Sequence, residues 1–165
     1  MGNEFGHPEW IDFPREGNGW DYSHARRQWS LRDDPGLRFK ALGDFDRELM
    51  RTVAPRCKGG TEFLLADEEA KIAVWLRGDT MFAFNFHPSH SRADFAVAVP
   101  PATAWRHLLD TDETRFGGHG RIAPGTLHMP EGVQRGGETV QCIRIYLPAR
   151  TGAVFGREPH AAPLR

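Results

Sequence analysis

Cysteine is scarce in this chain of 165 residues, and so is every feature that would point to a membrane. Cys57 and Cys142 stand far apart with no metal or redox motif around them, which indicates a reduced intracellular protein. No apolar run approaches the length of a membrane span, and the first twenty residues carry acidic groups instead of an apolar core. We therefore expect no secretory signal and no membrane partner, and we predict a cytoplasmic location.

An excess of charge of either sign is also missing. The chain has 21 Lys and Arg against 22 Asp and Glu, a formal net charge of −1, and neither residues 1–56 nor residues 57–165 form a hidden basic module. Nucleic-acid binding needs clustered positive charge, so this class of partner is excluded. The 39% hydrophobic and 26% charged residues are typical of one globular domain, or of a domain with an appendage.

The first third of the chain predicts one amphipathic helix. Apolar residues recur at every fourth position between about Pro35 and Ala54, which places a stripe on one helix face. Asp33 and Asp34 suit its N-terminus and Pro55 its end. The stripe consists of Leu37, Ala41, Phe45, Leu49 and Val53.

From Thr61 onward the apolar period falls to two or becomes short continuous runs, in a chain rich in glycine and proline. The segment Arg77 to Thr80 predicts a hairpin turn, and the Gly-rich stretch from Phe116 to Gly137 predicts a long loop. Several short strands at this spacing favour a mainly β protein, an antiparallel β-sandwich. The expected strands are Glu62–Ala66, Lys71–Arg77, Met81–His87, Asp94–Val99, Trp105–Asp110, Thr139–Leu147 and Gly152–Phe155.

The densest chemistry lies at the start of the chain, where carboxylates, an amide, an imidazole and a guanidinium alternate with aromatic rings. This mixture suits a sugar, whose C–H faces stack on aromatic rings while its hydroxyls need planar donors and acceptors. Glu4, Glu9 and Asp12 offer the carboxylate pair of a glycosidase. The alternative is that these carboxylates cap turns and pair with Arg15, Arg26 or Arg27.

Motifs for other chemistry are lacking. His87 and His90 have ligand-like spacing, but no cysteine or third carboxylate accompanies them, so we expect no metal. His119, in a glycine-rich stretch, has no evident base or nucleophile partner. The surrounding glycines do not form a phosphate-binding fingerprint, and the nucleophile elbow Gly-x-Ser-x-Gly is missing. No cofactor is implied.

A set of segments runs through the chain in order: Met1–Asn18, Ala25–Leu31, the helix that contains Phe45, Phe84–Ser89, Leu109–Asp112, Phe116–His119 and Ile145–Arg150. In this order and spacing they resemble the glycogen (1,4-α-glucan) branching enzymes of the α-amylase superfamily. The opening eighteen residues carry the most specific likeness.

The resemblance implies a division of the chain into three parts. Residues 1–56 would be the terminal strand, loop and helix of a catalytic (β/α)8 barrel, residues 57–158 an α-amylase-type C-terminal all-β domain, and residues 159–165 a tail. Strand-end loops of such barrels carry substrate-contacting residues. The resemblance therefore assigns an acceptor-side wall for α-glucan, formed by Asn3, Glu4, His7, Trp10, Asp12 and Arg15, with Glu9 among its supports.

The resemblance also implies a retaining glycosyltransferase that forms α-1,6 branches in glycogen biosynthesis. The family's nucleophile and acid/base carboxylates come from earlier barrel strands, so all of them would precede Met1. We therefore expect no catalytic residue in this chain and no activity in isolation. With no barrel to cover it, the apolar helix stripe and the rings of Phe5, Phe13 and Trp29 would lie against water or against the β-domain, so residues 1–56 would be mobile or self-associating.

Two alternatives remain open at the level of the sequence. The chain is either a free-standing, non-catalytic β-sandwich that binds α-glucan through surface aromatics such as Trp75 or Trp105, or a subunit that completes a barrel supplied by another chain. Binding of glycogen without turnover would favour the first, and a gain of activity on mixing with an upstream barrel chain would favour the second.

Overall fold

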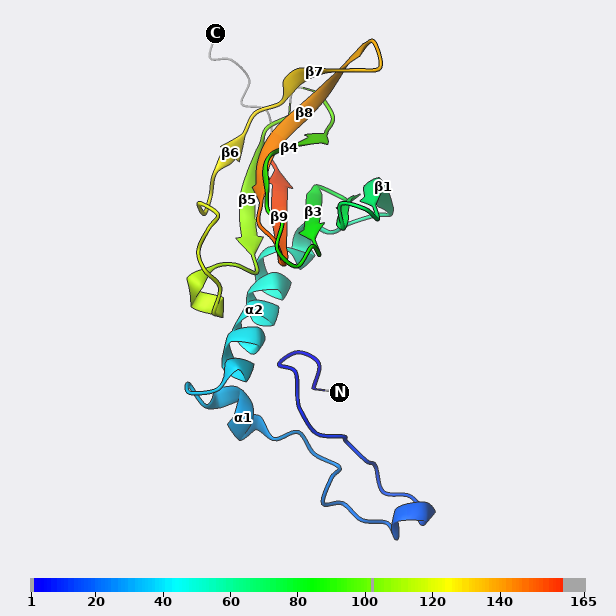
Figure 1. The fold of residues 1–165 in the computed structure, drawn as a ribbon. Coiled ribbons are helices and arrows are strands. Elements are labelled where there is room, and N and C mark those ends of the chain that lie inside the picture. Colours follow the sequence, from blue (N-terminus) through cyan, green and yellow to red (C-terminus); the bar gives the residue numbers. More distant parts are fainter. Residues whose placement is uncertain (1, 102, 159–165) are drawn as a thin grey trace.

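Figure 1 shows the chain as a computed structural model, which describes residues 2–101 and 103–158. The expected tail, residues 159–165, lies outside these residues. An extended N-terminal segment leads into the short helix α1 (Trp29–Asp33) and the longer helix α2 (Arg38–Thr52). All strands follow α2, so the helical and the β parts are consecutive in the chain, as the sequence predicts.

Helix α2 starts without the predicted aspartate cap. Its N-cap is Leu37, which has extended backbone and no side-chain acceptor. The Asp34 carboxylate accepts a hydrogen bond from the backbone N–H of Gly36 at 2.8 Å, which forms a turn before the helix. A short 3-10 helix, Ala54–Arg56, follows α2. The predicted end of the helix near Pro55 is confirmed. The predicted cap is wrong, because the Asp34 carboxylate accepts a hydrogen bond within the preceding turn.

One face of α2 packs on the β part of the molecule. Val53, at 2% exposure, forms a small apolar cluster with Leu109 and Val154, and Phe45 and Leu49 pack against that cluster. The apolar stripe of the sequence therefore meets the β-domain over its C-terminal half. Leu42 and Met50 lie beside the stripe and stay exposed.

Two antiparallel sheets form the rest of the fold, which confirms the prediction of a mainly β protein. The larger sheet has the order β1-β2-β3-β9-β5-β6 and the smaller one β4-β8-β7. Inward side chains of both sheets share one core that includes Val74, Met81, Val97, Ile143 and Ile145. The strands are β1 (Thr61–Asp67), β2 (Ile72–Arg77), β3 (Thr80–Asn85), β4 (Arg92–Ala98), β5 (Trp105–Asp110), β6 (Leu127–His128), β7 (Glu131–Arg135), β8 (Glu138–Leu147) and β9 (Thr151–Arg157).

The stretch predicted as one long loop, from Phe116 to Gly137, contains two strands. Strand β6 pairs with β5, and β7 forms a hairpin with β8. Gly136 and Gly137 make the hairpin turn with φ of 58° and 89°, a left-handed conformation that glycine adopts without strain. The loop prediction is wrong for β6 and β7, because two of the glycines that signalled a loop, Gly136 and Gly137, form the turn of a hairpin.

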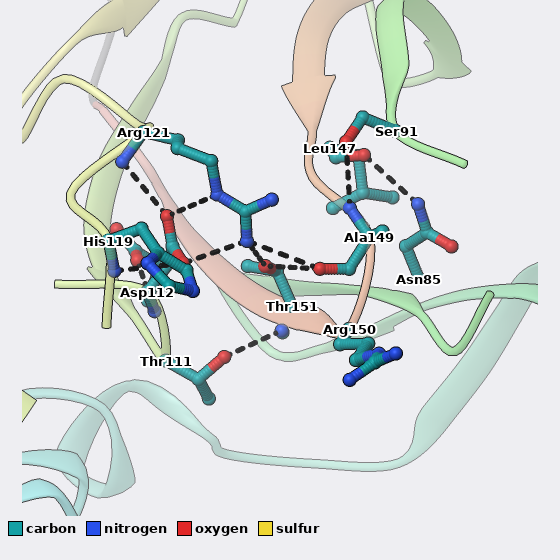
Figure 2. A network of polar contacts seen from close by, with 12 residues as sticks. Asn85, Ser91, Thr111, Asp112, His119, Arg121, Leu147, Ala149, Arg150 and Thr151 are labelled. Carbon is teal, nitrogen blue, oxygen red and sulfur yellow. Dashed lines mark hydrogen bonds and ion pairs between the residues drawn. The ribbon is translucent and has the colours of Figure 1, made fainter. Parts of the chain in front are cut away.

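Asp112 fixes the loop that follows β5 (Figure 2). Its carboxylate accepts hydrogen bonds from the backbone N–H groups of His119 and Arg121 and from the Arg121 guanidinium. A side chain at Gly118 would have no room, because its Cβ would lie 2.2 Å from the Asp112 carbonyl. Arg121 also donates to the carbonyl of Ala149, so this loop is tied to the turn between β8 and β9.

Candidate functional site

His7 organises the N-terminal segment. Its Nε2 accepts a hydrogen bond from the backbone N–H of Gln28 at 3.1 Å. Its Nδ1 therefore carries the proton and donates to the carbonyl of Glu9 at 3.0 Å. The side-chain amide of Gln28 also donates to the Glu9 carboxylate. Because both ring nitrogens are engaged, His7 positions its neighbours and has no free lone pair for proton abstraction.

Phe5 packs beneath this contact and does not lie where we expected it. The ring is completely buried, with an edge-to-face contact to His7 at a centroid distance of 5.7 Å and a tilted contact to Trp29 at 5.4 Å. The expectation that Phe5 lies against water or the β-domain is wrong, because the segment folds back on itself and covers the ring. Phe13 and Trp29 are exposed, as expected.

Two of the three candidate carboxylates of the segment, Glu4 and Asp12, are paired with arginine. Glu4 lies 2.8 Å from Arg27, and Asp12 lies 3.2 Å from Arg15. A hydrogen bond from Asn18 and a second from Arg15 lower the pKa of Asp12. At neutral pH this carboxylate is therefore deprotonated, whereas a glycosidase general acid needs a raised pKa. The arrangement agrees with the arginine-pairing alternative of the sequence and not with a catalytic carboxylate pair.

A shallow cavity of about 360 Å³ brings part of the predicted sugar site together. Glu9, Trp10 and Asp12 line it with His24, which the sequence did not single out. The Trp10 side chain is 82% exposed and presents its indole to solvent. No sequence motif marks His24. It reaches the cavity because its backbone carbonyl accepts a hydrogen bond from the backbone N–H of Asp12 at 3.1 Å.

The other predicted site residues do not line this cavity. Asn3 belongs to a tight turn whose carbonyl accepts the N–H of Gly6. Glu4 forms an ion pair with Arg27, and His7 is hydrogen-bonded to the Glu9 carbonyl. Arg15 reaches the site only through Asp12. The cavity can accept a sugar hydroxyl at its carboxylates and a sugar face on Trp10.

A second aromatic surface, the aromatic row, runs over strands β1 to β3. Alternation turns Ile72, Val74 and Leu76 of β2 into the core and places aromatic rings on the opposite face of the larger sheet. The rings of Trp75 and Phe84 stack nearly parallel at 4.8 Å and those of Phe84 and Phe86 at 5.6 Å, whereas Phe63 is tilted by 52° against Trp75. The row consists of Phe63, Trp75, Phe82, Phe84 and Phe86.

Only the ends of the aromatic row offer free ring faces. Trp75 and Phe84 stack against each other and against further rings, whereas Phe63 and Phe86 are 72% and 64% exposed. Gly152 on the neighbouring strand makes room for the row, because a Cβ there would lie 2.7 Å from the Phe84 ring. Trp75 is thus part of an aromatic surface, as suggested. The same suggestion for Trp105 is wrong, because this side chain points into the core and is completely buried.

Metal-binding and membrane-spanning features are also lacking in the structure as described. The rings of His87 and His90 stack at 4.1 Å, but Nδ1 of His87 accepts two backbone N–H groups. No cluster of three or more potential ligands among residues 2–101 and 103–158 is arranged to hold a metal ion. In the same residues, no helix is both long and apolar enough to cross a membrane.

A known protein family matches the β part of the chain. The family model described as the alpha amylase, C-terminal all-beta domain, matches residues 64–158. The matched region starts inside β1 and runs through the end of β9, so it covers both sheets and leaves out the N-terminal segment and α2.

Curated relatives extend the likeness to most of the chain. A 1,4-alpha-glucan-branching enzyme of Solanum tuberosum is 44% identical over 138 residues, which is 81% of this chain and 16% of that protein. The corresponding enzyme of Yarrowia lipolytica is 39% identical over 161 residues, 95% of this chain and 23% of that protein. A chloroplastic/amyloplastic one from Oryza sativa is 40% identical over 168 residues, 95% and 20%. The chain thus spans about a fifth of the length of these relatives.

Proposed function

Because the chain belongs to the alpha amylase C-terminal all-beta domain family, we propose that it is the C-terminal part of a 1,4-α-glucan branching enzyme that acts in glycogen biosynthesis. One observation carries this proposal: relatives with that name are about 40% identical over most of the chain, yet the chain covers only about a fifth of their length. The predicted cytoplasmic location belongs to the same proposal. The Oryza sativa relative is named as chloroplastic/amyloplastic, so this location is proposed for the present chain and not for the whole family.

The domain boundary proposed at residue 57 agrees with the packing. Helix α2 ends at Thr52, and β1 starts at Thr61, with the 3-10 turn Ala54–Arg56 between them. On its β-domain side α2 buries Val53, while Met50 remains 60% exposed. Residues 1–56 would form the last element of a barrel, whose other elements would cover such exposed apolar groups. Those other elements, or a second copy, are the proposed protein partner.

The chain is proposed to supply no nucleophile and no acid/base. A retaining branching reaction breaks an α-1,4 bond, forms a glycosyl-enzyme and passes the glucan chain to a 6-hydroxyl, and it needs one carboxylic acid that donates a proton. The ion pairs of Glu4 and Asp12, together with the lowered pKa of Asp12, support a different role. These residues would shape the wall that the acceptor glucan meets, with Trp10 as its stacking surface.

A chimera tests this proposal. The Solanum tuberosum enzyme is prepared without the 138 residues that match this chain, and again with this chain in their place. Branching is measured as new α-1,6 linkages released by a debranching enzyme. We expect no branching from the 165-residue chain or from the shortened enzyme, and clear branching from the chimera. Branching by the isolated chain would overturn the proposed inactivity, and an inactive but folded chimera would overturn the proposed role.

The aromatic row supports a second candidate function, a surface that holds α-glucan without chemistry. Its exposed rings, Phe63 and Phe86, offer the apolar faces that pyranose rings stack on. We expect Phe86→Ala to weaken retention of the chain by glycogen in an affinity gel about fivefold or more. Met129→Ala is the control, because Met129 is comparably exposed at 60% but belongs to no aromatic row. Equal retention of both variants would show that the aromatic row does not bind the glucan.

A further inference from the structure

A groove runs between α2 and the loop after β5. Two adjoining cavities of about 490 and 580 Å³ form it, and both are lined by Arg38, Thr111, Gly117 and His119. We call it the helix–loop groove. Cavities of this size are typical of small-molecule sites. Neither the proposed acceptor-side wall nor the aromatic row uses it.

The two ends of the helix–loop groove differ in chemistry. One end is apolar, with Ala41, Leu42 and Phe45 from α2 and Phe116 from the facing loop. One face of Phe116 is covered by the Arg115 guanidinium at 4.4 Å, and its ring meets Phe45 edge to face at a centroid distance of 5.3 Å, so Phe45 and Phe116 form this end together. The other end is polar and is lined by Ser89, Asp112, Arg121 and Arg150.

The groove carries an uncompensated positive charge. Its ionisable lining groups are Arg38, Asp112, His119, Arg121 and Arg150. Asp112 and Arg121 neutralise each other at 2.8 Å. Among the residues that the structure describes, Arg38 and Arg150 form no ion pair. Two arginines without a carboxylate partner therefore line the groove, in addition to His119.

Arg150 is presented by a strained turn. Its backbone has φ of 58°, a left-handed conformation that residues with a Cβ rarely adopt and that glycine or asparagine adopts readily. The turn is held on both sides, by Arg121 at the Ala149 carbonyl and by Ser91 at the Ala149 N–H (Figure 2). Nε of Arg150 donates to the Pro88 carbonyl at 2.8 Å, which leaves the outer nitrogens of the fork available.

We propose that the helix–loop groove binds a phosphomonoester carried on a glucose residue, with the phosphate between Arg38 and Arg150 and the sugar against Ala41, Leu42 and Phe45. A phosphomonoester carries close to two negative charges at neutral pH, which matches two guanidinium groups, and the planar forks fit its oxygens. The choice of glucose rests on the proposed function, whereas the choice of phosphate rests on the groove alone. The ester can belong to a free hexose phosphate or to a phosphorylated α-glucan.

Titrations of the full chain test the proposal and separate the two sources. The probes are glucose 6-phosphate, glucose, inorganic phosphate, and a phosphate-bearing α-glucan before and after phosphatase treatment. We expect glucose 6-phosphate to bind at least tenfold more tightly than glucose or inorganic phosphate. Preference for the phosphorylated glucan over glucose 6-phosphate would identify the polymer as the source, and the reverse preference the free sugar. Either preference supports the proposal that the helix–loop groove binds a phosphomonoester carried on glucose.

Two variants locate the site. Arg150→Asn removes the guanidinium but keeps a residue that tolerates positive φ, and Arg38→Gln removes the other guanidinium from an exposed helix position. We expect each to weaken glucose 6-phosphate binding about tenfold. Lys71→Asn is the matched control, because Lys71 also has positive φ, 59°, and is exposed, yet lies outside the groove. Thermal unfolding of each variant verifies that it is folded.

Three outcomes would overturn the proposal. Equal affinity for glucose 6-phosphate and inorganic phosphate would show that the groove does not recognise the sugar. Equal affinity for the treated and untreated glucan, together with no binding of glucose 6-phosphate, would show that it does not recognise the phosphate. An equal loss of binding in Lys71→Asn would show that the ligand does not bind in the groove. Failure of the proposed function would give a different result: glucose 6-phosphate would bind through Arg38 and Arg150, but the chimera with the Solanum tuberosum enzyme would stay inactive.

Discussion

Arg121 grips Asp112 through two atoms: its Nε lies 3.0 Å from one carboxylate oxygen and its terminal nitrogen 2.8 Å from the other. The Asp112 side chain is only 4% exposed, while that of Arg121 is 32% exposed. The loop after β5 and the turn between β8 and β9 meet at this pair. Both walls of the polar end of the helix–loop groove therefore depend on it.

Asp112→Asn is expected to lower the free energy of unfolding by about 2 to 4 kcal/mol, because the arginine then lacks its counter-charge and two backbone N–H groups lose a charged acceptor. Urea unfolding followed by circular dichroism measures the change. Asp79→Asn is the control: Asp79 is 66% exposed and its ion pair with Arg157 is long, at 3.7 Å, so its loss should cost under about 1 kcal/mol. Equal effects would show that the Asp112 network adds no special stability.

Acid should weaken the fold through the same carboxylate. Burial raises the pKa of Asp112, but hydrogen bonds from Arg121 and from backbone N–H groups outweigh it and lower the pKa to about 2. Since the folded pKa lies below the unfolded value, this stabilisation is complete above about pH 4 and is lost as pH falls towards 2.

The difference in unfolding free energy between the wild type and Asp112→Asn should therefore shrink by about 2 kcal/mol between pH 5 and pH 2.5. Asp12, Asp44 and Glu48 also have lowered pKa values, and their contributions cancel because both proteins share them. A difference that stays constant over this range would contradict the assignment.

Gly118→Ala should disrupt the loop after β5. The new Cβ would lie 2.2 Å from backbone atoms of Asp112, which cannot rotate away, so we expect a loss of about 3 kcal/mol in unfolding free energy. Gly60→Ala adds the same methyl group where no atom lies within 4 Å, and it should change stability by less than about 0.5 kcal/mol. A tolerated Gly118→Ala would mean that the loop has a different path.

The fold could be predicted well where side-chain periodicity decides it. Strand β5 has the predicted bounds, and the turn from Arg77 to Thr80 joins β2 and β3 as expected. Strands β6 and β7 were missed, because β6 is too short for a pattern and the glycines around β7 indicate a loop. The helix cap was wrong because Asp34 has two possible uses, a cap or a turn, and sequence alone does not rank them.

The site was predicted only in part, for a related reason. Composition gathers Glu9, Trp10 and Asp12 in one segment, and the structure places them around one cavity. The pair of Asp112 and Arg121 gives no local signal, because eight residues, three of them glycines, lie between its members. Trp105 was considered as a surface residue although its strand buries it, since alternation does not say which face meets the core until both sheets are placed.

The contact between α2 and the β-domain can be tested by two neighbouring truncations. Val53→Ala removes methyl groups from a cluster with Leu109 and Val154 and should cost about 2 kcal/mol. Met50→Ala, on the exposed side of the helix, should cost less than about 0.5 kcal/mol. Equal small effects would indicate that α2 does not rest on the β-domain in solution.

We expect the mobility predicted for residues 1–56 to be confined to the part before α1. Trp10, Trp20 and Tyr22 are all more than 60% exposed, and the backbone around Trp20 and Tyr22 is held by short-range turn contacts. Phe86 is equally exposed, but its N–H donates to the Lys71 carbonyl at 2.8 Å at the end of a paired strand. Local opening governs proteolysis, so we expect chymotrypsin to cut at Trp20 or Tyr22 at least roughly tenfold faster than at Phe86.

Mass spectrometry of the early fragments identifies the cut, and sedimentation at two protein concentrations shows whether self-association protects the segment. First cleavage in α2 would contradict the packing of Phe45 and Val53 on the β-domain. Equal rates at Tyr22 and Phe86 in a monomer would mean that the extended segment is as stable as the sheet, and the proposal that residues 1–56 need a barrel to cover them would then fail.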